Sequence, residues 1–293
     1  MLRQRVVTAV VLVAIMFAAL AAPGRWPFAL VSLVLFAAGA WEWGRLNAAS
    51  NALAVAMALV FALVAIAIYA GGAEPARRAW LGPLWGVTAV VWLVGGAWAL
   101  RRGPSAWPHW PVMLRRLLGL LLLASAWLAL VHSRTLGINF MLSMLCLVWM
   151  ADIAAYFGGR ALGRRKLAPS ISPGKSWEGV WSGVAGVLLL AALWIALDRA
   201  YALDGPSLYS RLLGALGWAL AAPMLLALCA LSVVGDLFES LVKRAAGAKD
   251  SSRLLPGHGG VLDRVDALLP VMPAAMALAA WSQSGVTAGL PLR

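Results

Sequence analysis

The run LLGALGWALAAPMLLALCALSVVGDLF, residues 212–238, decides the class of fold to which this chain belongs. It is long enough for a helix that crosses a bilayer, which needs about 20 mostly apolar residues, and it carries Asp236 near its end. The whole chain of 293 residues is 63% hydrophobic and 12% charged, which is more apolar surface than one soluble core can bury. The sequence therefore predicts an all-α, polytopic integral membrane protein.

Further apolar runs on both sides of this one give about nine predicted transmembrane helices. Their approximate limits are 5–22, 27–46, 51–70, 80–100, 116–132, 137–157, 179–197, 212–238 and 267–282. The first run follows a basic start and resembles a signal peptide, but the spans that come directly after it favour a retained first helix. We find no internal repeat and no linker, so 1–293 is predicted to be a single membrane domain.

The positions of the Lys and Arg residues predict the topology. Of the 24, 17 fall on the side of the N-terminus and 7 on the opposite side, which favours a cytoplasmic N-terminus and an outer C-terminus in the cell inner membrane. The connections 158–178 and 239–266 then face the cytoplasm; without them the count is 7 against 7. The bases lie in short clusters and form no basic face, so nucleic acid is not an expected partner.

Acidic residues gather around the same two connections. Seven of the eleven lie there: Asp152, Glu178, Asp236, Glu239, Asp250, Asp263 and Asp266. A carboxylate at a membrane-helix end costs several kcal/mol unless it is paired or binds a cation. Oxygen ligands without Cys or His favour Mg²⁺ over zinc. The alternative is that each acid pairs with a neighbouring Lys or Arg, and for any single acid both interpretations stay open.

Spacing adds detail to this acidic region. Asp236, Ser240 and Lys243 would share one helix face, and Asp263 and Asp266 are three residues apart, so two carboxylate pairs would converge on one centre.

Two glycine-containing segments are candidates for phosphate binding. PGHGG at 256–260 exposes backbone N–H groups beside His258, as a phosphate-holding turn requires. SPGKSWEG at 172–179 is either a helix start or a second phosphate-binding loop carrying Ser172 and Lys175.

Three further polar residues receive no functional role. His109 and His132 are predicted to lie in loops, far in the sequence from the acidic clusters. Glu42, in WEWGR, is expected to pair with Arg45 three residues later.

The run SLVKRAAGAKDSSRLLPGHGGVLDRVD at 240–266 resembles the signature of phosphatidate cytidylyltransferases, also called CDP-diacylglycerol synthases. The segments 151–179 and 235–240 are similar to that family as well. The resemblance covers the C-terminal half, whereas the first 130 or so residues match only as a set of membrane helices. It implies that 136–293 holds the catalytic helices, and we expect 1–135 to be a scaffold that faces lipid and a dimer partner.

The resemblance implies a transfer of the cytidylyl group from CTP to phosphatidic acid, giving CDP-diacylglycerol and pyrophosphate. It implies Mg²⁺, with K⁺ as an additional cation, and a homodimer among membrane lipids. The metal ligands would be Asp236, Asp263 and Asp266, with Asp152 and Glu239 as further candidates. The catalytic group would comprise Asp236, Lys243, Arg244, Lys249, Asp263 and Arg264. Substrate binding would involve Ser172, Lys175, Ser240, His258, Gly259 and Gly260.

Other functions remain open at this point. One alternative keeps the fold and changes the reaction, to a CTP-dependent lipid kinase or a cytidylyltransferase with another lipid phosphate acceptor. A cation-coupled transporter would carry acids near the bilayer midplane on several helices, with an internal repeat. A purely structural scaffold would leave the acidic cluster unexplained.

Overall fold

The computed structural model describes residues 2–71, 79–201 and 203–287, and it is built almost entirely of helices. The helices of the N-terminal half are α1 (Leu2–Ala21), α2 (Trp26–Leu46), α3 (Asn51–Gly71), α4 (Leu81–Val90), α5 (Ala97–Arg102) and α6 (Val112–Ser133). A π-helical stretch, Val91–Gly96, joins α4 to α5, so that Leu81–Arg102 forms one candidate membrane-spanning segment.

The C-terminal half contains longer helices and one small sheet. Its helices are α7 (Ile138–Leu162), α8 (Trp177–Ala200), α9 (Leu208–Ala245), α10 (Leu262–Val265) and α11 (Leu268–Thr287). Between α7 and α8, the predicted loop 158–178 contains an antiparallel hairpin of β1 (Lys166–Ala168) and β2 (Ser172–Ser176). The helix α9 bends at Gly217, whose φ of 66° is not helical.

The prediction of an all-helical membrane protein is confirmed. In the described parts of the chain, eight helical segments are long and apolar enough to cross a membrane. The remaining predicted span, 5–22, coincides with α1, whose apolar part Val6–Ala21 is shorter, so the predicted number is approximate. The predicted loop 239–266 is shorter than expected, because α9 continues to Ala245 and α10 begins at Leu262.

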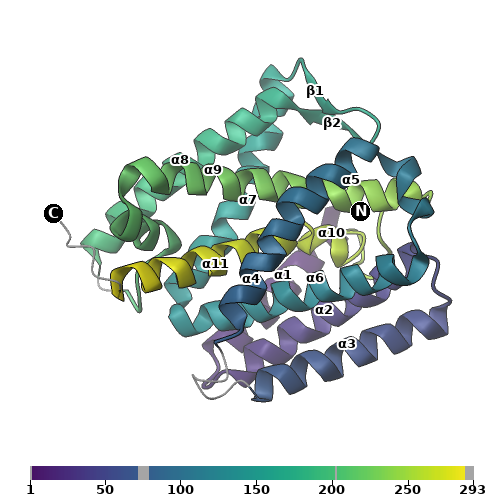
Figure 1. The fold of residues 1–293 in the computed structure, drawn as a ribbon, viewed down its shortest axis with the longest axis horizontal. Helices are drawn as coiled ribbons and strands as arrows, with labels where there is room; N and C mark the ends of the chain where they lie inside the picture. Colours follow the sequence, from purple (N-terminus) through teal and green to yellow (C-terminus); the bar gives the residue numbers. More distant parts are fainter. Residues whose placement is uncertain (1, 72–78, 202, 288–293) are drawn as a thin grey trace.

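The helices form two groups on either side of a central pair, α9 and α11. Figure 1 shows α2, α3 and α6 on one side of α11, and α8 and the hairpin on the far side of α9. The helix α7 packs on α8 and also contacts α9 and α11. The packing of α7 on α8 depends on glycines: a Cβ on Gly183 would lie 2.9 Å from the Ala151 carbonyl oxygen, and one on Gly179 would lie 2.9 Å from that of Ala155. Such small residues let membrane helices approach closely.

Both charged connections lie at the end of the bundle where the N-terminus lies (Figure 1). The hydroxyl of Thr8 in α1 donates to the Pro256 carbonyl at 3.1 Å, and Arg244 at the end of α9 donates to the carbonyl of Ile171 in the hairpin turn at 3.4 Å. Three of the bases assigned to the opposite side, Arg77, Arg78 and Arg293, lie outside the described residues.

The placement of His132 in a loop was wrong. This residue lies in the last turn of α6 and is 5% exposed, with Nδ1 2.8 Å from the Leu128 carbonyl oxygen. The helix continues to Ser133 because its apolar face stays buried to that point. His109 is exposed in a short 3-10 turn, Pro104–His109.

Candidate functional site

A cavity of about 630 Å³ lies between α7, α8, α9 and β2. Small residues form one wall, because the close approach of α7 and α8 leaves alanines and glycines facing it. The polar residues that line it are Asp152, Tyr156, Arg160, Ser172, Lys175, Ser176 and Asp236. Cavities that bind small-molecule ligands typically have volumes of about 300–1,000 Å³, and this cavity falls within that range.

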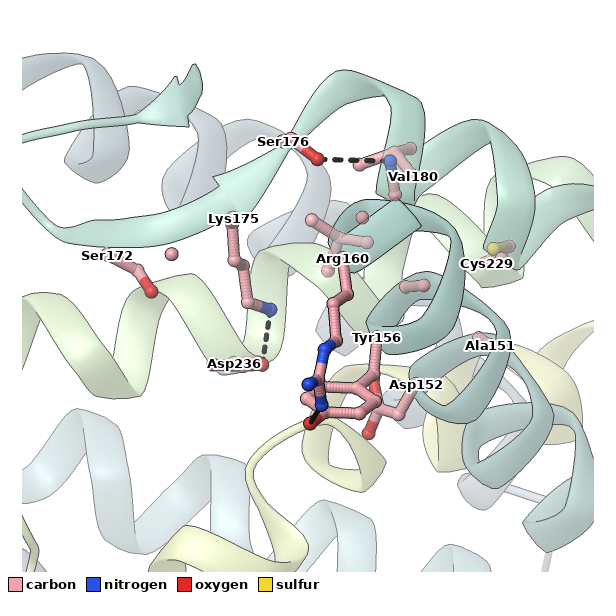
Figure 2. Close-up of a pocket in the computed structure, with 16 residues that line it drawn as sticks. Ala151, Asp152, Tyr156, Arg160, Ser172, Lys175, Ser176, Val180, Cys229 and Asp236 are labelled. Atoms are coloured by element: carbon pink, nitrogen blue, oxygen red, sulfur yellow. Dashed lines mark hydrogen bonds and ion pairs between the residues drawn. The ribbon is translucent and has the colours of Figure 1, made fainter. Parts of the chain in front are cut away.

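The α7 wall carries three polar side chains at intervals of four residues. Asp152, Tyr156 and Arg160 therefore share one face of the helix, and the Arg160 guanidinium donates to the Tyr156 hydroxyl at 3.2 Å (Figure 2). Sequence reasoning identified Asp152 but missed the other two residues. The four-residue spacing was the signal that would have found them.

The strand β2 brings Ser172 and Lys175 to the cavity. Figure 2 shows Lys175 reaching from the strand to Asp236 on α9, and the two form an ion pair. Each side chain is 27% exposed, so the pair remains accessible from the cavity. Ser176, the last residue of β2, accepts a hydrogen bond from the Gly179 N–H at 3.2 Å and caps α8. The segment 172–179 is thus a helix start that also lines the cavity.

A third carboxylate, that of Asp266, belongs to the same group of charges. It interacts electrostatically with Asp236, Lys175 and Asp152. The junction of α10 and α11 reaches this position because residue 235 on α9 is glycine: a Cβ there would lie 2.5 Å from the Asp266 carbonyl oxygen. Asp236 forms the ion pair with Lys175, while Asp152 on α7 and Asp266 in the turn between α10 and α11 interact with it electrostatically.

A second group of charges lies further along α9. The Lys243 ammonium lies 2.6 Å from a carboxylate oxygen of Glu239 and 2.6 Å from one of Asp263. The side chain of Glu239 is 3% exposed and buried, and those of Lys243 and Asp263 are 13% and 10% exposed and partly buried. Because Lys243 is one helical turn beyond Glu239, it faces both acids at once. Lys243, which the resemblance placed in the catalytic group, is thus the counter-ion of two carboxylates.

Asp263 also holds the loop between α9 and α10. Its carboxylate accepts from the Ser251 N–H at 3.0 Å, the Ser251 hydroxyl at 2.9 Å and the Gly260 N–H at 2.8 Å. The start and the end of this loop are therefore joined through one side chain.

The predicted glycine turn lies within that loop, where the His258 N–H donates to the Leu255 carbonyl at 2.8 Å. Gly257 and Gly259 have φ values of 77° and 84°, in the left-handed region that favours glycine. The turn borders its own cavity of about 750 Å³. The residues that line this loop cavity are Asp250, Ser252, Arg253, Leu255, Pro256, Gly257, His258, Gly259 and Arg264. Arg264 donates to the His258 carbonyl, which orients the turn.

The remaining predicted residues lie around these two groups. The Ser240 hydroxyl donates to Asp236 at 3.4 Å, one helical turn away, in agreement with the predicted shared face. Arg244 donates to the carbonyls of Ile171 and Ala248 and so connects the hairpin turn to the loop after α9. Lys249 is exposed in that loop.

The acids form one group around Lys175 and another around Lys243. Within the described ranges, no three His, Cys, Asp or Glu side chains lie close enough to one another to hold a metal ion as they stand. The donor set itself suits Mg²⁺, because it consists of carboxylate oxygens. Five carboxylates share two lysine counter-ions, and the excess of negative charge suits a divalent cation.

The expected pairing of Glu42 with Arg45 was wrong. The Arg45 guanidinium donates to the Ala49 carbonyl at 2.8 Å, and Glu42 is fully buried at 0% exposure. Its carboxylate contacts the loop between α9 and α10 instead. Sequence reasoning noted an acid near a helix end, but the partners lie more than 200 positions away in the chain.

Comparisons with known proteins cover nearly the whole chain. A family profile described as the cytidylyltransferase family matches residues 3–281. The chain is 40% identical over 288 residues to a phosphatidate cytidylyltransferase of Pseudomonas aeruginosa, covering 96% of this chain and 99% of that one. It is 34% identical to one of Haemophilus influenzae, covering 93% and 96%. A relative of the same name from Brucella suis is 48% identical over 137 residues, 45% of this chain and 44% of that one.

Proposed function

The chain belongs to the cytidylyltransferase family, and from that premise we propose that it transfers the cytidylyl group of CTP to phosphatidate. The products are CDP-diacylglycerol and pyrophosphate. The protein is a multi-pass membrane protein, which suits an acceptor whose acyl chains cost about 0.8 kcal/mol per CH₂ to remove from the bilayer.

The observation that carries the proposal is the cavity between α7, α8 and α9. It combines apolar walls within membrane-spanning helices with Lys175, Arg160 and Asp236. An amphipathic lipid phosphate needs both kinds of surface, one for the acyl region and one for the charged head group.

The reaction makes modest demands on proton transfer. A phosphate oxygen of phosphatidate forms a bond to the α-phosphorus of CTP, while the bond from that phosphorus to the bridging oxygen breaks and pyrophosphate leaves with the electron pair. The attacking oxygen is already ionised, so no strong general base is needed. The protein must supply in-line positioning and neutralise the phosphate charges.

The described side chains divide this work between the two ends of the site. At the cavity, Lys175 and Ser172 would hold a phosphate group, and Arg160 adds a second positive charge. Ser240 would orient Asp236. At the loop cavity, His258 and Gly259 would hold the triphosphate. Gly260, the third predicted residue, does not line this cavity, because its N–H donates to Asp263.

The remaining basic residues of the motif would stabilise phosphate charge. These are Lys243, Arg244, Lys249 and Arg264, the first of which also balances Glu239 and Asp263.

Mg²⁺ is part of the proposal. Asp236, Asp263 and Asp266 would hold it, with Asp152 and Glu239 close by, and K⁺ would be an additional cation. When bound, the metal neutralises charge on the transferring phosphates and on pyrophosphate. The excess of carboxylates over lysines supports this assignment.

The cellular setting follows from the same reasoning. The site would face the cytoplasm from the inner membrane, where CTP is available, and the N-terminal helices of two copies would form a homodimer. The positive-inside count supports the orientation.

The test is direct. Purified protein is incubated with CTP, phosphatidic acid and Mg²⁺, with EDTA added in a control, and both CDP-diacylglycerol and pyrophosphate are measured. We expect both products to form with Mg²⁺ and neither to form when EDTA is added. CDP with a phosphorylated lipid would identify a lipid kinase, and CTP binding without turnover would show that the acceptor is another lipid phosphate.

A further inference from the structure

Glu42 is a buried acid whose hydrogen-bond partners are remote in the sequence. It lies near the end of α2, in the N-terminal half, and is 0% exposed. Among the residues that the structure describes, no lysine or arginine forms an ion pair with it. A buried carboxylate without a counter-ion must be satisfied by hydrogen bonds.

Four donors from the loop between α9 and α10 satisfy this carboxylate. One oxygen accepts from the Ser252 hydroxyl at 2.5 Å and the Val261 N–H at 2.9 Å. The other accepts from the Ser251 hydroxyl at 3.2 Å and the Leu262 N–H at 2.6 Å. Each oxygen therefore takes one hydroxyl and one backbone N–H. The contacts join both ends of the loop, as those of Asp263 do from the other side.

The sequence of the loop is adapted to this contact. A Cβ on Gly260 would lie 2.5 Å from a carboxylate oxygen of Glu42 and 1.9 Å from the Ser251 hydroxyl oxygen. Only glycine leaves room for the carboxylate to reach the N–H groups that follow. Packing against Glu42 and Ser251 therefore explains why residue 260 is glycine, without any role in phosphate binding.

We propose that Glu42 is a positioning residue, which holds the loop and thereby fixes the carboxylate of Asp263 and the glycine turn for catalysis. The inference rests on the proposed function for its catalytic consequence but not for the contact itself. Leu262 directly precedes Asp263, and Ser251 is shared between the two acids. Release of Glu42 would therefore free the backbone on which Asp263 depends.

The informative variant is Glu42→Gln. It keeps the shape of the side chain but replaces one acceptor oxygen with a donating NH₂. Serine hydroxyls can reverse their direction, whereas a backbone N–H cannot, and each carboxylate oxygen faces one such N–H. In either orientation of the glutamine amide, its NH₂ group therefore faces a backbone N–H, so that a donor meets a donor.

Asp198 supplies the matched control. It lies in α8, at the end of the bundle away from the site, and its carboxylate also accepts four hydrogen bonds, from Asn139, from the N–H and hydroxyl of Ser207, and from the hydroxyl of Ser210. Asp198→Asn removes a comparable set of contacts without touching the loop.

The experiment measures hydrogen–deuterium exchange and steady-state kinetics of wild type, Glu42→Gln and Asp198→Asn. In Glu42→Gln we expect peptides covering 251–262 to exchange about tenfold faster and kcat to fall about tenfold or more, with the KM for phosphatidate unchanged within about threefold. In Asp198→Asn we expect faster exchange only around 203–210 and an unchanged kcat.

Each result decides the proposal. Unchanged exchange at 251–262 in Glu42→Gln would refute the anchoring, and faster exchange with normal kcat would refute the positioning role. An equal loss of kcat in Asp198→Asn would mean a general effect on the fold, which also refutes it. If the wild type forms no CDP-diacylglycerol, the proposed function fails, while the exchange measurement still decides whether Glu42 anchors the loop.

Discussion

Replacing Lys243 with methionine tests the charge cluster that it forms with Glu239 and Asp263. The ammonium is the counter-ion of Glu239 and Asp263, at 2.6 Å from each. Methionine has a similar length and no charge, so Lys243→Met leaves both acids without their ammonium counter-ion. Asp263 keeps its hydrogen bonds from Ser251 and Gly260, whereas Glu239, with a side chain 3% exposed, has no such substitute among the described residues.

The size of the effect follows from this burial. Removing one partner of a buried ion pair destabilises a protein by about 3–5 kcal/mol. We expect the lower value of about 3 kcal/mol, because Asp263 retains other donors. At about 2–4 °C per kcal/mol, the apparent melting temperature in detergent should fall by about 6–12 °C.

A double-mutant cycle separates this charge effect from other causes. Glu239→Gln combined with Lys243→Met removes the unpaired charge, so the melting temperature should recover by at least half of the loss. A single variant as stable as the wild type, or a double variant no more stable than the single one, would refute the pairing. If turnover recovers together with stability in the double variant, Lys243 does not also contact substrate phosphate.

Three further outcomes are expected. Asp263→Asn should lower turnover by about 100-fold or more while the protein still elutes as a folded species in detergent, because it removes a proposed metal ligand; near-normal CDP-diacylglycerol formation would exclude that role. Lys175→Met should lower kcat/KM for phosphatidate by about 100-fold, because the cavity loses the cation proposed to hold the lipid phosphate, and an unchanged value would place that phosphate elsewhere. Gly183→Ala should lower stability by about 1–3 kcal/mol, because its Cβ meets a backbone carbonyl of α7. Gly214→Ala is the control, since nothing lies within 4 Å of its Cβ, and equal melting temperatures would contradict the close packing.

The membrane helices were predictable because their signal is local. A run such as 212–238 must be helical in lipid, since every backbone N–H and C=O group has to be satisfied within the segment. The limits of the predicted spans agree closely with the helices for this reason. The hairpin of β1 and β2 was not predicted, because its short strands carry no alternating pattern and lie in a basic connection.

The site was predictable in part, for two different reasons. The motif at 240–266 carried the family resemblance, and the concentration of acids around it indicated a charged centre. Asp236 and Lys175 do line one cavity together. Tyr156 and Arg160 were missed although their spacing from Asp152 places all three on one helix face, because an aromatic and a basic residue near a helix end are common at membrane interfaces.

The sequence by itself determined the class of fold, the approximate number and limits of the spans, and the family, because hydrophobic length and a dense motif are properties of short stretches of chain. Only the tertiary structure decided which charges meet. It paired Lys175 with Asp236 and Lys243 with Glu239 and Asp263, and it brought Glu42 to a loop more than 200 residues later. These partners depend on how separate helices pack, and a buried carboxylate binds whichever donors that packing places within hydrogen-bond distance.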